Sequence, residues 1–366
     1  MRITKISVDN VPPVKKFHVD SLSDLIVIAG ANGAGKTRLV SHILLAFQKP
    51  ALSNIQFSIE CTNEEELEQF GKQVIDSTDR GQRSKLQTML QQNRQRRNFK
   101  SGILYFESDR SIAPVQPLAF SFEFADPYTE SIGWNVPMQP LKNRWQDTQH
   151  AIFKKILTLR NQLGSRAMQL GREGRDQMGL GFDDPIQPFM DAFSMLLAPK
   201  RLVQPDLQQQ KLMYEENGEK RPIDTLSSGE REVLNVAFDF ILRKPTDCIV
   251  FFDEPELHLH PELLGRLIRT LQSSGKRNQF FFISHSPEVI ASSLDDTVIF
   301  LTKPKEDGSN QATILKPDGE TTGALLALGQ SVGIVALGKK IVLIEGTKSS
   351  LDAKVYSAIN RDFAAC

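Results

Sequence analysis

The stretch LIVIAGANGAGKT, from Leu25 to Thr37, decides the fold: an apolar run leads into a glycine-rich loop and then into a helical pattern. The spacing GxxxxGKT between a strand and a helix predicts a loop whose backbone N–H groups surround phosphate groups, helped by the positive helix end. We expect Lys36 to reach the β- and γ-phosphates of a nucleoside triphosphate and the Thr37 hydroxyl to ligate Mg²⁺. The residues expected to bind the nucleotide are Gly30, Asn32, Gly33, Ala34, Gly35, Lys36 and Thr37.

Two further apolar runs end in polar residues. The run CIVFFDEPELHLHP begins at Cys248 and carries Asp253 and Glu254 directly after its apolar part. We expect Asp253 to hold Mg²⁺ and Glu254 to orient and deprotonate an attacking water. The run FFFISHSPEVI places His285 at the end of another strand, and ligands bind where the carboxyl ends of parallel strands meet. His285 is therefore expected to donate a hydrogen bond to the γ-phosphate or to the attacking water.

Composition indicates a soluble globular protein of 366 residues, with 40% hydrophobic residues and 44 basic against 44 acidic side chains. This balance gives no global attraction to nucleic acid or to a membrane. No apolar run approaches the roughly 18 residues of a membrane helix, and no signal-peptide core stands at the N-terminus. Three scattered cysteines favour a reducing compartment, so we expect a cytoplasmic protein. His258 and His260 could ligate a metal, but a role in loop geometry or at a subunit contact is favoured.

Apolar strands alternate with helical patterns in the first and last thirds of the chain. This pattern predicts an α/β fold with a mostly parallel sheet that is covered on both faces. Residues 1–61 and 201–335 are expected to form the core. Residues 62–200 are expected to be an inserted helical region, interrupted by strand-like stretches at 103–107 and 120–124.

Charge is uneven within the expected insert, because seven basic residues and no acidic residue lie between Arg80 and Lys100. A charge run is most often a solvated helix face. The sharper alternative is a contact surface for phosphate backbones, for which Arg94, Arg96 and Arg97 are the candidates.

A second serine- and glycine-rich loop, DTLSSGERE, runs from Asp224 to Glu232. We expect Gly229 to open the following helix, which places Ser227 to Gly229 at a positive helix end suited to an anion. The phosphate loop at Lys36 lies far away in the sequence. A two-fold dimer could complete two sites, each from the loops of two chains.

GANGAGKT, LSSGE, FFDEP and the histidine of ISHSP together resemble the four nucleotide motifs of ABC-type ATPases. The resemblance implies ATP and Mg²⁺ as cofactors and a homodimer or higher homo-oligomer. In that family the signature of one chain closes over the γ-phosphate held by another chain. Three positions depart from common family patterns: Ser228 replaces a glycine, Glu230 a glutamine of transporters, and Ala31 a proline. The resemblance implies that the following residues act in trans: Ser227, Ser228, Gly229 and Glu230.

DEPELHLHP and SHSP resemble the non-transporter branch, which includes the SMC, RecF and OLD (overcoming lysogenization defect) groups. This resemblance covers roughly residues 1–60 and 200–300. YFESDRS, from Tyr105 to Ser111, is similar to a segment of OLD-like ATPases, and Gln116 is a candidate for the family's Q-loop glutamine. Residues 336–366 resemble the start of a TOPRIM nuclease segment with Glu345 as its first carboxylate. An ordinary last strand and helix of the ATPase core is an equal alternative.

Three functions remain open on these residues. The first is an ATP-driven dimerising ATPase that acts as sensor or regulator, by resemblance in anti-phage defence. The second is a DNA-binding repair or recombination ATPase. The third is an ATP-gated scaffold for a separate TOPRIM-type nuclease effector. LSSGE argues against a small-molecule kinase, and nothing in the sequence indicates a membrane partner.

Overall fold

The structure, a computed structural model, describes residues 1–48, 54–95, 99–108, 110, 145–172, 184–206, 208–209, 211–256, 259–286, 289–290, 293, 295–304 and 308–315. Six predictions lie outside these residues: the strand at 120–124, the candidate Q-loop Gln116, the basic pair Arg96 and Arg97, His258, Glu345, and the TOPRIM-like segment at 336–366.

The centre of the molecule is a six-stranded sheet with the order β13-β12-β3-β11-β10-β6. Every neighbouring pair is parallel except β12 and β13, which confirms the predicted α/β fold with a mostly parallel sheet. β3, β10, β11 and β12 are buried along their whole length, and this is why they appear as continuous apolar runs in the sequence. The strands are β3 (Leu25–Ala29), β6 (Ile103–Phe106), β10 (Ile249–Asp253), β11 (Gln279–Ser284), β12 (Thr297–Leu301) and β13 (Ala312–Leu315).

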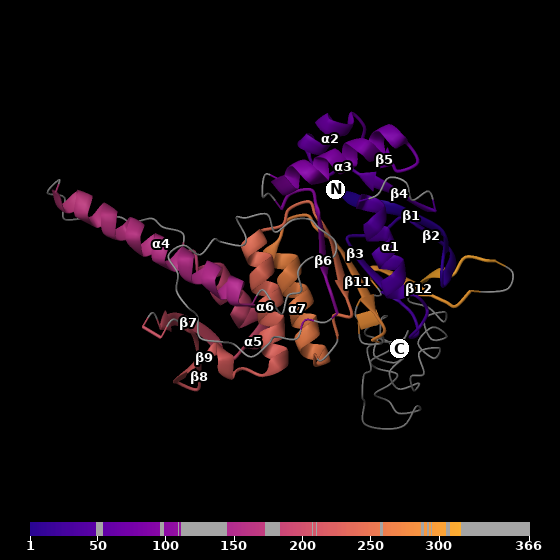
Figure 1. Ribbon diagram of the computed structural model, residues 1–366. Helices are drawn as coiled ribbons and strands as arrows, with labels where there is room; N and C mark the ends of the chain where they lie inside the picture. Colours follow the sequence, from indigo (N-terminus) through magenta and orange to yellow (C-terminus); the bar gives the residue numbers. More distant parts are fainter. Residues whose placement is uncertain are drawn as a thin grey trace, which may run out of the picture.

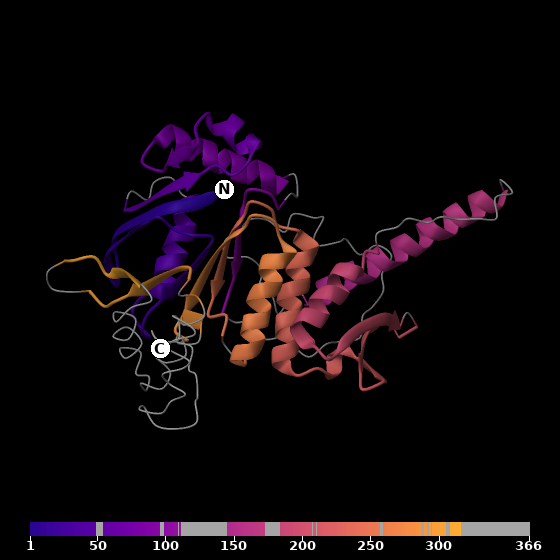
Figure 2. The ribbon, with the colours of Figure 1, turned by 180° about the vertical axis from the view of Figure 1, so that it is seen from behind.

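Each face of this sheet has its own cover (Figures 1 and 2). One face packs against α1 and a four-stranded antiparallel sheet of order β2-β1-β4-β5, with α2 and α3 beyond it. Those elements are α1 (Lys36–Gln48), β1 (Arg2–Val11), β2 (Val14–Asp20), β4 (Ile55–Glu60), α2 (Glu64–Phe70), β5 (Val74–Asp76) and α3 (Arg80–Gln95). The other face packs against four helices: α4 (Trp145–Arg172), α5 (Gln187–Leu197), α6 (Ser228–Arg243) and α7 (Pro261–Ser274).

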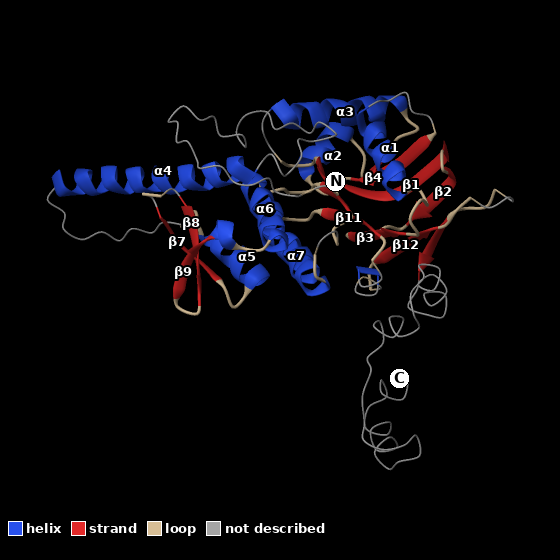
Figure 3. Cartoon of the chain, turned by 60° about the horizontal axis from the view of Figure 1, so that its bottom comes forward, coloured by secondary structure: helices blue, strands red, loops and turns tan. Residues whose placement is uncertain are grey.

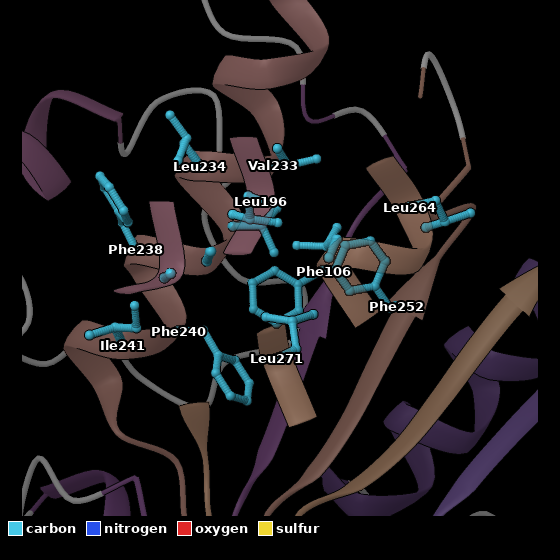
Figure 4. Packing of buried hydrophobic residues seen from close by; sticks show 14 of the residues in the cluster. Phe106, Leu196, Val233, Leu234, Phe238, Phe240, Ile241, Phe252, Leu264 and Leu271 are labelled. Carbon is cyan, nitrogen blue, oxygen red and sulfur yellow. The ribbon is translucent and has the colours of Figure 1, made fainter. Parts of the chain in front are cut away.

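Phenylalanines from alternate positions of the strands supply both hydrophobic cores. Phe252 packs against Phe106 and Phe282, with ring centroids 5.2 and 5.9 Å apart, on the face that α6 and α7 cover (Figure 4). On the opposite face, Phe251 and Phe281 stack at 4.7 Å. Each such side chain contributes about 1.5–3 kcal/mol through burial, so the strand that carries Asp253 is firmly anchored.

The expected helical insert, residues 62–200, contributes β6 to the central sheet, where Phe106 lies opposite Phe252 of β10. Its helix α4 contacts α6 through its first turns and then projects away from the core, with Met168 72% exposed (Figure 3).

A small antiparallel sheet stands directly before α6. It consists of β7 (Arg201–Asp206), β8 (Lys211–Glu216) and β9 (Glu219–Pro222). Asn217 and Gly218 connect β8 to β9, both with positive φ angles of 53° and 83°. Such a pair is typical of the tight turn that joins two antiparallel strands. The chain leaves β9 through a short 3-10 turn, Ile223–Thr225, and enters α6.

Candidate nucleotide site

The phosphate loop connects β3 to α1, as the sequence predicts. Gly30 has a φ of 157°, and a Cβ atom there would lie 2.6 Å from the carbonyl oxygen of Leu301. Gly35 has a φ of 97°, and its Cβ atom would lie 2.6 Å from Cγ of Pro13. Glycine is therefore required at both positions, because the loop is packed closely between β12 and the β1–β2 hairpin.

Lys36 is 7% exposed, and its Nζ donates to the carbonyl oxygens of Gly30 at 2.8 Å and Ala31 at 3.3 Å. Burial lowers the pKa of Lys36, although the carboxylates of Glu254 and Glu256 act in the opposite direction. The lysine thus stands over its own loop with acidic residues nearby. A triphosphate fits this arrangement, because its negative charge would stabilise the buried ammonium group.

Asp253 lies at the tip of β10 and is 2% exposed. Its Oδ1 accepts a hydrogen bond from the Thr37 hydroxyl at 3.3 Å, and its Oδ2 accepts one from the Tyr105 hydroxyl at 3.4 Å. Burial, followed by the neighbouring Glu254 carboxylate, raises the pKa of Asp253 to about 6. A hydroxyl and a carboxylate that are close together provide the hard oxygen ligands that Mg²⁺ prefers, so these residues fit the expected metal.

Glu254 has an unusual backbone conformation, with a φ of 44°. Its N–H donates to the carbonyl oxygen of Ile283 at 2.8 Å, and its own carbonyl oxygen accepts from Nη2 of Arg110 at 2.8 Å. A left-handed conformation at a residue other than glycine costs about 1–3 kcal/mol, and it persists here because neighbours fix both sides of the residue. Nδ1 of His285 lies 3.8 Å from Oε1 of Glu254, so the structure brings these two predicted residues together.

Glu256 organises the loop after β11, although the sequence patterns did not single it out. Its Oε1 accepts hydrogen bonds from the Ser284 hydroxyl at 2.8 Å and from the N–H groups of His285 at 2.9 Å and Ser286 at 3.2 Å. The same oxygen lies 3.3 Å from Nδ1 of His285. Glu256 therefore holds His285 beside Glu254.

Arg110 is a second residue that the sequence patterns did not single out. It is 1% exposed, and its guanidinium lies 4.8 Å from the ring centre of Phe252. Nη1 donates to the carbonyl oxygen of Asp253 at 2.7 Å, and Nε forms an ion pair with Glu232 of α6 at 2.9 Å. Together with its bond to Glu254, Arg110 joins the first turns of α6 to the end of β10.

The signature loop, Ser227 to Glu230, forms the N-terminus of α6. The helix begins at Ser228, one residue earlier than expected, because Ser227 and Glu230 form a reciprocal capping box. Oε2 of Glu230 accepts from the N–H of Ser227 at 3.0 Å and from its hydroxyl at 2.8 Å, while Oγ of Ser227 accepts from the N–H of Glu230 at 3.3 Å. The helix end thus has a fixed conformation.

The signature loop and the phosphate loop belong to opposite faces of the central sheet. α6 packs in the core on one face, and α1 packs in the core on the other (Figure 1). Because Arg110 binds both α6 and the tip of β10, the signature end of α6 lies towards the carboxyl edge of the strands. Both loops therefore stand at that edge.

The basic run is only partly available for a partner. Arg83 is 7% exposed, with its guanidinium 5.9 Å from the ring centre of Phe57, and Lys100 pairs with Glu65 at 2.9 Å. The backbone of the candidate Arg94 lies in α3, but its side chain is outside the described set.

Nδ1 of His260 accepts a hydrogen bond from the N–H of Glu262 at 3.4 Å and caps α7. His260 thus contributes to the local geometry at the start of α7, which is one of the two roles that the sequence favours for it. Within the described ranges, no group of three or more His, Cys, Asp or Glu side chains could hold a metal ion. Among the described helices, none is both long enough and apolar enough to cross a membrane.

Comparisons with known proteins identify relatives of part of the chain and of its fold. Residues 141–291 match the family described as "AAA domain, putative AbiEii toxin, Type IV TA system". The chain is 28% identical over 141 residues to protein ea59 of Escherichia phage lambda, a match that covers 38% of this chain and 25% of that protein. It is 30% identical over 132 residues to a retron Ec83 probable ATPase of Escherichia coli, covering 33% and 23% respectively. The chain thus spans about a quarter of the length of these relatives.

A solved structure of an SMC head, bound to the C-winged helix domain of ScpA, has the same fold. It superposes with a TM-score of 0.50 at 16% sequence identity and covers 86% of this chain and 98% of that chain. The predicted fold is therefore confirmed by its likeness to an SMC head, and parts of the chain are similar to an AAA-domain family and to a retron probable ATPase.

Proposed function

We propose that this chain is an ATPase that dimerises when it binds ATP and acts as a nucleotide-driven sensor or regulator. The observation that carries the proposal is the position of the two loops at one edge of the sheet but on opposite faces. A loop that is fixed at a helix N-terminus and stands apart from the phosphate loop of its own chain is suited to the phosphate of a second chain.

Within each site, the residues of this chain would have separate roles. Lys36 would contact the β- and γ-phosphates, and Thr37 with Asp253 would hold Mg²⁺. MgATP supplies the phosphoanhydride bond that is broken. Glu254 accepts a proton from the attacking water, and His285, held by Glu256, orients that water or donates to the γ-phosphate. Ser227 to Gly229 of the second chain would complete the site.

The biological role is proposed from the relatives. The motifs resemble those of OLD-like ATPases, and the chain is similar to a retron probable ATPase and to a family described as "AAA domain, putative AbiEii toxin, Type IV TA system". These similarities support a role in anti-phage defence, with dimer closure as the signal.

Two other functions have weaker support. Binding to DNA rests on exposed basic residues of α3, namely Arg80 and Lys85, since Arg83 and Lys100 make contacts within the protein. This function would be supported by a DNA affinity that falls with rising salt and that is lost when Arg80 and Lys85 are neutralised. A separate TOPRIM-type nuclease effector rests on residues 336–366, which lie outside the described part of the chain.

Glu254→Gln tests the proposed catalytic base. We expect ATP hydrolysis to fall by about 10²–10⁴-fold, because an amide cannot accept the proton. ATP binding should persist, so the variant should accumulate as an ATP-bound dimer. Steady-state phosphate release measures the first effect, and analytical ultracentrifugation with ATP and Mg²⁺ measures the second.

Glu68→Gln provides the matched control, because Glu68 is an exposed residue of α2 on the distant antiparallel sheet side. This control should hydrolyse ATP at the native rate. A Glu254→Gln variant that also hydrolyses ATP at the native rate would show that Glu254 is not the base.

A further inference from the structure

The carboxylate of Glu230 is saturated by two different partners. Its Oε2 accepts both hydrogen bonds from Ser227, and its Oε1 accepts a hydrogen bond from Nζ of Lys200 at 2.8 Å. The side chains of Lys200 and Glu230 are 18% and 21% exposed, so the pair is largely shielded from water. The signature loop therefore contains an acidic residue whose charge is balanced from outside the loop.

The β7–β9 sheet holds Lys200 in place. Nζ lies 5.7 Å from the ring centre of Tyr214 in β8 and 3.8 Å from Oε1 of Glu216 at the end of the same strand. The Tyr214 hydroxyl also shares a hydrogen bond with Oγ1 of Thr225, at 3.1 Å, just before the signature loop. The signature region is thus contacted by Tyr214 of the sheet and by Lys200, the residue directly before β7.

Both groups are charged at neutral pH. Burial alone would raise the pKa of Glu230, but the hydrogen bonds from Lys200 and Ser227 outweigh it and bring the pKa below its usual value. Burial alone would lower the pKa of Lys200, but its hydrogen bond and attraction to Glu230 outweigh it and raise the pKa.

An acidic residue in this loop is unfavourable for a loop that receives a phosphate. With an effective dielectric constant near 20, a carboxylate roughly 10 Å from a phosphate charge weakens binding by about tenfold or more. A cation in contact with the carboxylate removes most of this penalty. The N–H groups at the start of α6 then retain their attraction for an anion.

We propose that Lys200 is a positioning residue of the shared site: it neutralises Glu230 and keeps the capping box intact, so that Ser227 to Gly229 can receive the γ-phosphate of ATP held by a second copy of this chain. The proposal rests on ATP-driven dimerisation, the proposed function. It makes the β7–β9 sheet part of the dimer site, because Lys200 directly precedes β7 and contacts Tyr214 and Glu216 of β8.

The test compares Lys200→Met, Lys200→Arg, Glu230→Gln and the double variant Lys200→Met/Glu230→Gln in the full chain. Dimerisation is measured by analytical ultracentrifugation with Mg²⁺ and a non-hydrolysable ATP analogue. Binding of a fluorescent ATP analogue is measured at protein concentrations where all chains are monomeric. Lys220→Met, an exposed lysine of β9 in the same small sheet, is the control.

We expect Lys200→Met to raise the dissociation constant of the dimer by about 100-fold, roughly tenfold for each of the two sites. Monomeric nucleotide binding should stay unchanged. Lys200→Arg and Lys220→Met should stay within about threefold of the wild type, and Glu230→Gln is the reference for the double variant. The double variant should dimerise as Glu230→Gln does, because the signature loop then carries no carboxylate to compensate, and Glu216 still has Arg221 at 3.9 Å.

Recovery of dimerisation in the double variant distinguishes charge compensation by Lys200 from a purely structural role of the ion pair. A purely structural role would appear as a loss of folding stability and would leave the dimer dissociation constant of Lys200→Met near that of the wild type. That result would overturn the inference, as would a double variant that dimerises as weakly as Lys200→Met. A wild-type chain that remains monomeric with the nucleotide would overturn the proposed function, and this inference with it.

Discussion

Asp253, the proposed Mg²⁺ ligand, occupies a position that costs stability. It lies at the buried tip of β10, and its pKa is raised to about 6 by burial and by Glu254. Because folding raises the pKa of this acid, its protonated form stabilises the native state. This contribution is complete below the pKa of the unfolded state, near 4, and is lost as the pH rises through the native pKa of about 6. At neutral pH the charge at this position therefore opposes folding unless a cation is bound.

Asp253→Asn should consequently stabilise the protein in the absence of nucleotide and Mg²⁺. A shift of about two pKa units corresponds to at most about 3 kcal/mol at pH 8, and the gain should shrink as the pH falls towards 5. Thermal unfolding with a metal chelator, measured between pH 5 and 8, tests this. Asp9→Asn, on an exposed residue of β1, should change little at any of these pH values. A lower midpoint for Asp253→Asn at pH 8 would contradict the argument.

Some site residues could be predicted from the sequence because their role depends on neighbours in the chain. The phosphate loop, Asp253 and His285 each follow an apolar strand, and a local pattern is enough to recognise them. Arg110 could not be recognised in this way, because its partner Glu232 is 122 residues away. The stretch YFESDRS drew attention only by its resemblance to OLD-like ATPases, and the contact itself is a product of tertiary packing.

At the level of elements, Arg110 is the link between α6 and β10. It pairs with Glu232 on the helix and donates to the carbonyl oxygens of Asp253 and Glu254 at the end of the strand. A movement of the signature end of α6 would therefore act directly on the backbone that carries the proposed base. Glu254 is already in a left-handed conformation, so its position depends on these contacts.

Arg110→Met should destabilise the protein by about 3–5 kcal/mol, because it removes a buried ion pair with Glu232 and the hydrogen bonds to the carbonyl oxygens of Asp253 and Glu254. Denaturation in urea, followed by circular dichroism, measures the loss. Arg110→Met/Glu232→Gln should recover part of it, since no uncompensated charge remains. Arg201→Met, on an exposed residue of β7, is the matched control and should change stability by less than about 0.5 kcal/mol. A stability of Arg110→Met equal to that of the wild type would mean that the ion pair does not hold these elements together.

The elements also show what a sequence pattern can and cannot predict. The apolar stretch at 103–106 predicts a strand because of its composition, and β6 is that strand. Its place beside β10 in the central sheet was not predicted, because strand pairing over a long separation leaves no local pattern. The same limit applies to the β7–β9 sheet, whose role beside the signature loop depends on the contact between Lys200 and Glu230.

For the molecule as a whole, the fold class could be predicted because the burial of strands leaves an apolar pattern throughout the chain. Strands that are buried on both faces must be apolar throughout, so β3, β10, β11 and β12 predict a covered, mostly parallel sheet. Quaternary structure could be proposed only through the separation of the two loops. That separation supports the central claim that each ATP is held by two chains.

Mixing two inactive variants tests this claim most directly. Lys36→Ala removes the phosphate contact but keeps a functional signature loop, whereas Ser227→Arg blocks the signature loop but keeps the phosphate loop. A heterodimer of the two contains one complete site, formed by the phosphate loop of the second variant and the signature loop of the first. Each variant carries a different fluorophore, and energy transfer between the two reports their association.

We expect neither variant alone to associate when ATP and Mg²⁺ are added, while Ser227→Arg still binds ATP. The mixture should show ATP-dependent energy transfer, weaker than that of two labelled wild-type chains because only one of two sites is complete. If Ser227→Arg alone dimerises with ATP as the wild type does, or if the mixture shows no ATP-dependent energy transfer, the two chains do not share their ATP sites.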